Sequence, residues 1–284
     1  MKGCDFTVEK RIAKGMTYII LLAVCVIFLF PLAWAIVSSI KPENDIVTYP
    51  PRWIPEIMTL SNYTLVLEKY PYLKWGLNSI ITAVLGTGLI LILSSLASYA
   101  FGRFNFKGKK VLYAMIVAML LIPIQAYMVP LFLLMSKMNM LNSYASIILP
   151  SAANVTSIFI LTSFFKELPM ELEEAARIDG CGEFGIFWKI MLPLSKPALS
   201  TVVILTFISN WNSFLWPMIA IRQDKLKTLP VGIAQFVGST NSNMQFQYGT
   251  ALAACCMAVI PTLIVYLALQ RYFVEGIANT GIKG

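Results

Sequence analysis

The sequence contains no histidine, and this absence removes a large part of the chemistry open to a chain of 284 residues. Histidine is the usual general base near neutral pH, the proton acceptor of catalytic triads and the commonest metal ligand. The one cluster of carboxylates, which runs from Glu171 to Glu183, lacks the spacing of a metal site and is better interpreted as a solvated helix face. We therefore predict no catalytic residue and no metal site.

Two further kinds of motif are missing. The cysteines show no C-x-x-C spacing that would indicate a zinc or redox site, and we interpret them as small apolar residues: Cys4, Cys25, Cys181, Cys255 and Cys256. A phosphate-binding loop of the form G-x-x-x-x-G-K-[ST] is also absent, since the nearest stretch, residues 102–110, has the wrong spacing. The chain is therefore expected to bind no nucleotide cofactor of its own.

Charged residues are scarce, at 13% of the chain, while hydrophobic residues make up 58%. Soluble domains usually carry about 25% charged residues, so lipid is the expected solvent for most of this chain. The net charge of +8 could suggest nucleic-acid binding, but the basic residues form short clusters between apolar runs and no long basic face. We predict a membrane protein that contacts lipid and binds no nucleic acid.

Long apolar runs are what the sequence does contain. A helix needs roughly 20 apolar residues to cross a hydrocarbon core of about 30 Å, and the alternating polar positions of a barrel strand are absent. The sequence predicts an all-α integral membrane protein with one transmembrane domain, residues 1–284, and six spans at about residues 16–40, 75–101, 111–135, 145–165, 199–220 and 249–269. Prolines predict kinks within these spans at Pro31, Pro123, Pro130, Pro150 and Pro261.

Basic residues in the short connections set the expected orientation of the spans. They are concentrated in the N-terminal arm, residues 2–14, and after the second span, residues 103–110. We therefore expect both termini and residues 166–198 in the cytoplasm. Residues 41–74 and 222–248 are expected on the outer side.

The cytoplasmic segment 166–198 should itself be structured. Pro169 suits a first helical turn, acidic residues follow it near the positive end of the helix dipole, and Gly180 can adopt the left-handed conformation that ends a helix. We predict a short helix from about Pro169 to Asp179, with Glu173 and Arg177 in a surface ion pair. One flat face carries Leu168, Leu172, Ala175, Ala176 and Asp179. That face suits a docking surface and, equally, packing on the bundle or on lipid headgroups.

The same segment contains a spaced motif, namely Glu174, Ala175, Ala176, then Gly180, then Ile190, Leu192 and Pro193. It resembles the cytoplasmic signature of binding-protein-dependent ABC permeases, which reads E-A-A, three residues, G, nine residues and I-x-L-P. The stretches SLASYAFGRFNFKGKK, ISNWNSFLWPMI and QRYFVEGIANTGIKG are similar to the carbohydrate-uptake branch, whose maltose-type permease has six spans. The resemblance implies that the motif forms a coupling helix between spans four and five, which contacts an ATPase.

The resemblance also implies a function and a set of partners. It indicates a permease subunit, and not an enzyme, in the inner membrane of a bacterium. Separate ATPase subunits would bind ATP and Mg, a second homologous permease would complete the pathway, and an extracytoplasmic binding protein would deliver the solute. Residues 222–248 are the candidate contact for that binding protein. A sugar or oligosaccharide is the expected solute, with glycerophosphodiester-type or other small polar solutes as the alternative.

For the solute path, the candidates are amide and aromatic side chains near the end of the fifth span: Asn210, Trp211, Asn212 and Trp216. Amides and aromatic faces can bind uncharged polyols. Hydrogen bonding between helices and an interfacial aromatic belt explain the same residues equally well. A secondary carrier is the competing function, but it would normally place ionisable residues in mid-membrane, and these spans have essentially none.

Overall fold

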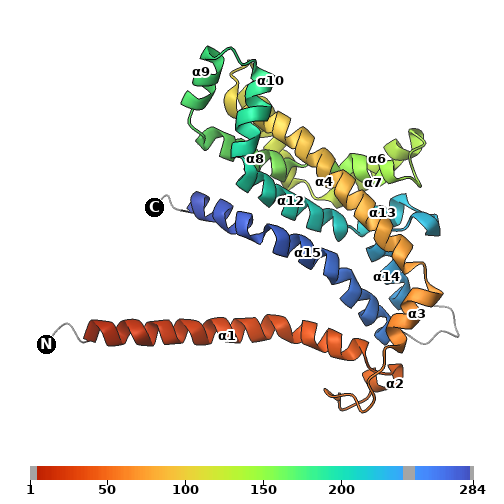
Figure 1. The fold of residues 1–284 in the computed structure, drawn as a ribbon. Helices are drawn as coiled ribbons and strands as arrows, with labels where there is room; N and C mark the ends of the chain where they lie inside the picture. The colour runs from red at the N-terminus through yellow and green to blue at the C-terminus, as the bar shows by residue number, and fades with distance from the viewer. Residues whose placement is uncertain (1–4, 239–246, 282–284) are drawn as a thin grey trace. The chain divides into compact units, whose positions relative to one another are not determined.

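The computed structural model describes residues 5–238 and 247–281, and all regular secondary structure in these two ranges is helical (Figure 1). The predicted all-α fold is therefore confirmed. Three helices are long and apolar enough to cross a membrane: α1 (Asp5–Ser39), α4 (Tyr72–Arg103) and α15 (Tyr248–Gly281). Their apolar stretches coincide with three of the six predicted spans and comprise Lys14–Ser39, Tyr72–Arg103 and Tyr248–Gln270.

The other candidate spans are bent pairs of helices. The first pair joins α5 (Lys109–Ala118) and the 3-10 turn η1 (Met119–Leu121) to α6 (Ile124–Lys137), with a bend of 104°. The second joins α7 (Tyr144–Ser151) to α8 (Val155–Glu167), with a bend of 41°. The third joins the helical run Glu183–Leu194 to α12 (Lys196–Trp211), with a bend of 76°. By length and composition, the described residues hold three spans, or up to six if each bent pair crosses as one.

Proline explains where these bends occur. Pro123 directly precedes α6 at the sharpest bend, because proline has no amide hydrogen to continue the hydrogen-bond ladder of the preceding helix. Pro150 is the penultimate residue of α7, next to the second bend, and Pro197 lies in the first turn of α12, just after the third. Pro31, Pro130 and Pro261 lie inside helices that continue past them.

Within the predicted fifth span, residues 199–220, the structure has two helices instead of one. α12 begins three residues earlier, at Lys196, and ends at Trp211. Residues 212–214 are not helical, and a separate helix, α13 (Leu215–Ala220), follows them. The interruption could not be predicted from composition, because the stretch as a whole is apolar. It lies at two polar residues, Asn212 and Ser213.

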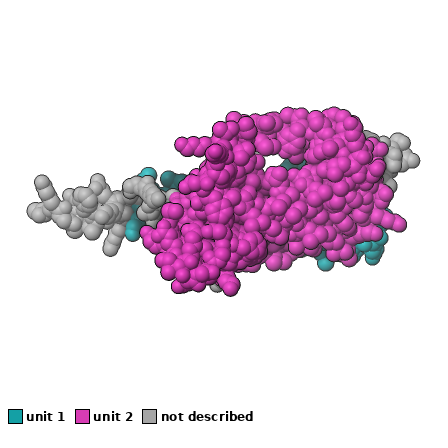
Figure 2. Space-filling view, turned by 90° about the horizontal axis from the view of Figure 1, so that it is seen from above, with its two compact units in different colours: residues 1–70, 233–257 teal, residues 71–232, 258–284 magenta. Residues whose placement is uncertain are grey.

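Short helices connect the long ones: α2 (Glu43–Ile46), α3 (Ser61–Lys69), α9 (Glu171–Ile178), α10 (Glu183–Ile186), the π-helical turn η2 (Phe187–Met191), α11 (Leu192–Leu194), the 3-10 turn η3 (Asp224–Leu226) and α14 (Leu229–Gly238). α14 occupies part of the predicted outer segment 222–248, and residues 239–246 of that segment lie outside the described residues. The chain divides into two compact units, coloured separately in Figure 2: residues 1–70 with 233–257, and residues 71–232 with 258–284.

In the larger unit, α4 lies side by side with α8 and α12 (Figure 1). Aromatic and aliphatic side chains from α4, α8, α9, the run Glu183–Leu194 and α12 form one buried cluster: Tyr99, Leu161, Phe165, Ala176, Ile186, Phe187, Met191, Ala198 and Val202. Gly102 allows α4 to approach α8 closely, because a Cβ atom at this position would lie 3.0 Å from the Cβ atom of Phe165. The cluster therefore connects the membrane helices directly to α9 and α10.

The Tyr72 end of α4 holds the chain segment that leads into α14. The side-chain amide of Asn78 donates hydrogen bonds to the carbonyl oxygens of Lys225 (3.0 Å) and Lys227 (2.8 Å). The Ser79 hydroxyl accepts one from the backbone N–H of Leu229 at 2.7 Å, and the Trp75 indole donates to the Asp224 carbonyl at 3.3 Å. This end of α4 and the segment are therefore joined by directional bonds that a one-residue shift would break.

In the smaller unit, polar contacts join the end of α1 to the start of α15. Asn62, on α3, donates to the carbonyl oxygens of Ser39 and Lys41, both at 2.8 Å. The ammonium of Lys41 is buried, donates to the Arg52 carbonyl at 2.5 Å and lies 4.4 Å from the centre of the Trp34 ring. Burial lowers the pKa of the Lys41 ammonium, and the nearby charge of Asp45 offsets part of that effect.

The Glu43 carboxylate is the cap of α15. It accepts hydrogen bonds from the first two backbone N–H groups of that helix, those of Tyr248 (2.5 Å) and Gly249 (2.8 Å). A negative group at this position satisfies N–H groups that have no partner within the helix and also complements the helix dipole.

We expect Glu43→Ala to lower the stability of the protein by about 1–2 kcal/mol, because it leaves these two donors uncapped. The measurement is the apparent melting temperature of the detergent-purified protein. Asp45→Ala, on the same short helix, is the comparison: it should lower the melting temperature less than Glu43→Ala does, because it removes a charge near Lys41 but leaves the N–H groups of α15 capped. Equal melting temperatures for the two variants would contradict the capping role.

Candidate coupling surface and solute path

The helix predicted in segment 166–198 is present as α9, Glu171–Ile178, within the predicted range of 169–179. Its first turn carries the three glutamates that favour the positive end of the dipole. The helix ends in a Schellman motif, because the N–H of Gly180 bonds to the Arg177 carbonyl (3.0 Å) and that of Cys181 to the Ala176 carbonyl (2.9 Å). Gly180 has φ +83°, which confirms the predicted left-handed conformation.

The two faces of α9 differ from the prediction. Ala176 is buried in the core cluster and Glu173 is also buried, so this side packs on the protein itself. The opposite side is exposed and carries Glu171, Ala175 and Ile178, the last of them 86% exposed. The predicted flat face is therefore wrong in one respect, since Ala175 and Ala176 point to different surroundings. Adjacent residues of a helix point in directions about 100° apart. Ala175 and Ala176 therefore do not share one face when only one side of the helix is buried.

The predicted pair of Glu173 and Arg177 exists, with 3.3 Å between the Glu173 Oε2 and Arg177 Nη2 atoms, but it is not a simple surface pair. The Glu173 side chain is only 2% exposed, and its Oε1 atom lies 2.5 Å from Nε of Arg103, the last residue of α4. Arg177 also pairs with Glu183, at 2.7 Å, and this hydrogen bond raises the pKa of the Arg177 guanidinium. In the sequence, Arg103 is only one of the basic residues after the second span that indicate orientation. No signal in the sequence indicates its contact with Glu173.

The second half of the motif lies in the run from Glu183 to Leu194. Ile190 and Leu192 pack at the edge of the core cluster, and Pro193 is exposed at the start of α11. The N–H of Leu192 bonds to the Phe187 carbonyl, five residues earlier, so η2 is a π-helical turn. Ser195 then donates through its hydroxyl to the Met191 carbonyl at 2.7 Å, at the 76° bend into α12.

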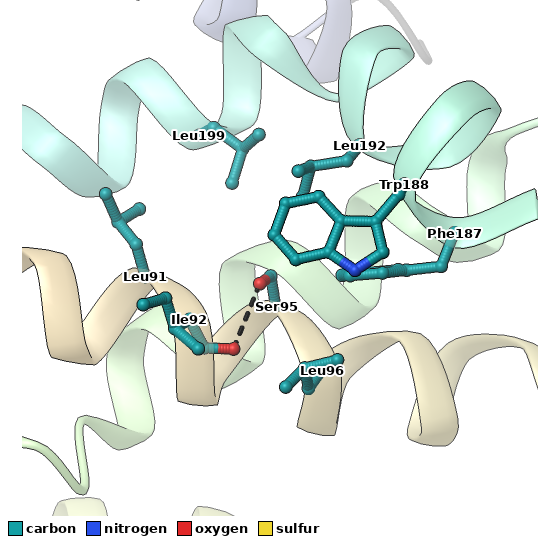
Figure 3. Close-up of a pocket in the computed structure, with 8 residues that line it drawn as sticks. All are labelled: Leu91, Ile92, Ser95, Leu96, Phe187, Trp188, Leu192 and Leu199. Carbon is teal, nitrogen blue, oxygen red and sulfur yellow. Dashed lines mark hydrogen bonds between the residues drawn. The ribbon is translucent and has the colours of Figure 1, made fainter. Parts of the chain in front are cut away.

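An apolar cavity of about 210 Å³ lies beside this run (Figure 3). Four residues of α4 line one side of it and four residues from η2, α11 and α12 line the other: Leu91, Ile92, Ser95, Leu96, Phe187, Trp188, Leu192 and Leu199. The lining is almost wholly apolar: the Ser95 hydroxyl donates to the Ile92 carbonyl at 3.1 Å, and the Trp188 indole carries the other polar atom among the lining side chains. The cavity therefore offers few polar groups to a sugar.

The four candidate solute-path residues fall into two groups. The indole of Trp211 donates to the Ala258 carbonyl (3.1 Å) and that of Trp216 to the Ser146 carbonyl (2.7 Å), and both rings are buried. These contacts join helices. Asn210 faces α4, with its amide 3.4 Å from the Thr87 hydroxyl, whereas Asn212 is exposed in the interruption after α12. Asn210 and Asn212 therefore lie at the same helix end, but Asn210 faces α4 and Asn212 faces outward.

Comparisons with known proteins show which family the chain belongs to. Residues 91–279 match the family described as "Binding-protein-dependent transport system inner membrane component". The chain is 32% identical to the arabinooligosaccharides transport system permease protein AraQ of Bacillus subtilis, over 96% of each chain. It is also 32% identical to the lactose transport system permease protein LacG of Rhizobium radiobacter, over 96% of this chain and 98% of the relative.

A solved structure agrees with this result. The crystal structure of a bacterial ABC transporter involved in the import of the acidic polysaccharide alginate contains a chain that is 27% identical. The two superpose with a TM-score of 0.82, over 93% of this chain and 98% of that one. The protein therefore belongs to the family of binding-protein-dependent transport system inner membrane components, and it is a transport permease subunit rather than an enzyme.

Proposed function

We propose that this chain is the permease subunit of an ATP-driven importer that takes up a sugar or oligosaccharide. The observation that supports it best is the exposed side of α9, which carries Ala175 and the nearly fully exposed Ile178 within the E-A-A motif. The neighbouring Met170 and Leu172 are exposed as well, and apolar side chains grouped in this way are typical of a surface that a partner covers. Relatives named for arabino-oligosaccharide and lactose transport support a saccharide as the solute.

The proposed topology is a single domain, residues 1–284, with six spans and both termini in the cytoplasm. The three long helices and the three bent pairs supply the spans, each pair crossing once. The basic residues of the N-terminal arm and of the connection after α4 support the orientation. α9 then lies on the cytoplasmic side, as the coupling helix.

In the proposed mechanism, separate ATPase subunits bind ATP and Mg, and α9 rests on one of them. Glu174, Ala175 and Gly180 supply the exposed contact and the end of the helix, while Ala176 seats the helix on its own bundle. Ile190, Leu192 and Pro193 determine where the chain bends into α12. A second permease subunit would complete the pathway, and an extracytoplasmic binding protein would deliver the solute. Closure of the ATPase would move α9 and so alternate access to the pathway.

For the solute path we propose the region around Asn210 and Asn212, where α12 ends and an exposed amide is available. Trp211 and Trp216 would shape this region by holding α12 and α13 to their neighbours, since their indole N–H groups already have partners. Uptake of a panel of labelled saccharides by liposomes containing the complete complex would identify the solute. Uptake by the chain alone without ATP would instead indicate a secondary carrier.

Substitution of Ala175 tests the coupling surface. We expect the wild-type protein, purified in mild detergent from its native membrane, to bring an ATPase with it. Ala175→Arg should reduce the recovered ATPase by about tenfold or more, because a bulky charge within an interface commonly costs about 2 kcal/mol. The variant should still be monodisperse, since Ala175 has no buried contact in this chain.

Two controls make this experiment specific. Ala175→Ser, which adds little volume, should recover as much ATPase as the wild type. Ala176→Arg should recover no ATPase and should also not purify as a monodisperse protein, because Ala176 lies in the core cluster. Undiminished recovery of the ATPase with Ala175→Arg would contradict the proposed coupling surface.

A further inference from the structure

The buried contact between Arg103 and Glu173 has no explanation in the function described so far. The Nε atom of Arg103 lies 2.5 Å from Oε1 of Glu173, and the two side chains are 4% and 2% exposed. These two atoms make no directional hydrogen bond, so their attraction is that of an ion pair. The guanidinium also donates from Nη2 to the carbonyl oxygens of Leu168 (2.8 Å) and Pro169 (3.2 Å). One side chain at the end of α4 thus holds both the entry to α9 and its first turn.

A second connection runs parallel to the first. Arg177 joins Glu173 on α9 to Glu183 on α10, and the Tyr99 hydroxyl donates to the Glu183 carboxylate at 3.3 Å. Tyr99 and Arg103 are four residues apart, so they lie on the same face of α4, one turn from each other. That single face of α4 therefore contacts both α9 and α10. In Figure 1, α9 and α10 lie together at the Arg103 end of α4.

Stability alone is a poor reason for this arrangement. Taking two charges out of water is unfavourable, and a buried ion pair can often be replaced by apolar residues of similar volume without loss of stability. Ala176 already packs α9 on the core cluster, so apolar packing is available at this position. What a buried ion pair with added hydrogen bonds does supply is a single defined arrangement of the elements that carry it.

We propose that Arg103 and Glu173 are positioning residues that make α9 and α4 one rigid body. A displacement of α9 then moves α4, the long helix that packs against α8 and α12, and does not merely change the angle between α9 and α4. This inference rests on the proposed docking of α9 on an ATPase. It adds that the movement enters the membrane through α4, in addition to the bend that leads into α12.

Spin labels in the complete transporter test the rigid joint. In a background without the native cysteines, labels replace two exposed residues, Glu171 on α9 and Leu93 on α4, and the distance between them is measured with no nucleotide and with ATP and vanadate. We expect one narrow distance that is the same in both states. A wild-type distance that changes with nucleotide would overturn the proposal without any variant.

Three variants separate a positioning role from a structural one. The double variant Arg103→Met with Glu173→Leu should fold and still recover the ATPase, because apolar packing replaces the pair, but its label distance should broaden and change with nucleotide. Glu173→Gln should broaden the distance as well. Arg177→Gln breaks only the more exposed connection, so its label distance should stay as narrow as in the wild type. A narrow, nucleotide-independent distance in the double variant would show that the pair is merely structural. Absence of the ATPase from the wild-type preparation would instead refute the docking of α9.

Discussion

Replacement of Gly180 by valine is expected to reduce transport by the assembled importer about tenfold or more, while the amount of protein in the membrane stays unchanged. Gly180 has φ +83°, in the region where a side chain with a branched β carbon is strained by about 1–3 kcal/mol, and 1.4 kcal/mol corresponds to a tenfold change in an equilibrium. α9 has only eight residues and depends on its end motif, so the strain should unwind its last turn.

The position of Gly180 makes this effect interpretable. A Cβ atom there would meet nothing within 4 Å, so the substitution acts through the backbone and not through a collision. Gly180→Asn is the matched control, because asparagine tolerates the left-handed conformation, and it should retain most of the transport. The measurement is the rate of solute uptake divided by the amount of inserted protein. Normal uptake by the valine variant would rule out a requirement for the ordered end of α9.

Gly232→Ala should lower the stability of the protein strongly, although it adds only one methyl group. A Cβ atom at Gly232 would lie 2.1 Å from Cε3 and 2.3 Å from Cδ2 of Trp75. The Trp75 ring is 2% exposed and its indole N–H is bonded to the Asp224 carbonyl, so it cannot simply move aside. We expect a loss of about 3 kcal/mol, the upper part of the range for overpacked cores, seen as a lower apparent melting temperature and a smaller yield of monodisperse protein.

Gly76→Ala is the control for this prediction. Gly76 adjoins Trp75 on α4, and a Cβ atom there would meet nothing within 4 Å. Because alanine is a better helix former than glycine, this variant should be as stable as the wild type or slightly more stable. Equal melting temperatures for Gly232→Ala and the wild type would mean that α14 does not pack against Trp75 as described.

The fold could be predicted from the sequence where composition alone decides it. The long apolar stretches of α1, α4 and α15 need no partner to be recognised, because lipid requires a helix whatever lies beside it. The end of α12 at Trp211 could not be predicted, since the residues that follow remain mostly apolar. The bend before α12 could not be predicted either, because a proline such as Pro197 is common in the first turn of helices that follow no bend.

The position of α9 could be predicted from the sequence, but the side chains that surround it could not. Gly180 and the acidic first turn are local signals, and they located α9 within two residues at its start and one at its end. Which side of α9 would be buried depends on Arg103, a residue 70 positions before Glu173 in the chain. No pattern in a single sequence joins these two residues, because each also has an ordinary explanation as a surface charge.

The π-helical turn η2 gives the spacing of the E-A-A motif a geometrical meaning. Its bond from Leu192 to Phe187 accommodates one residue more than an α-helical turn would. Removing one residue from this turn would still allow its two ends to bond, now as an α-helical turn, so the helical segments before and after it could keep their relative direction. The wide turn is therefore a place where a chain of this kind can lose a residue without turning α12 relative to α9.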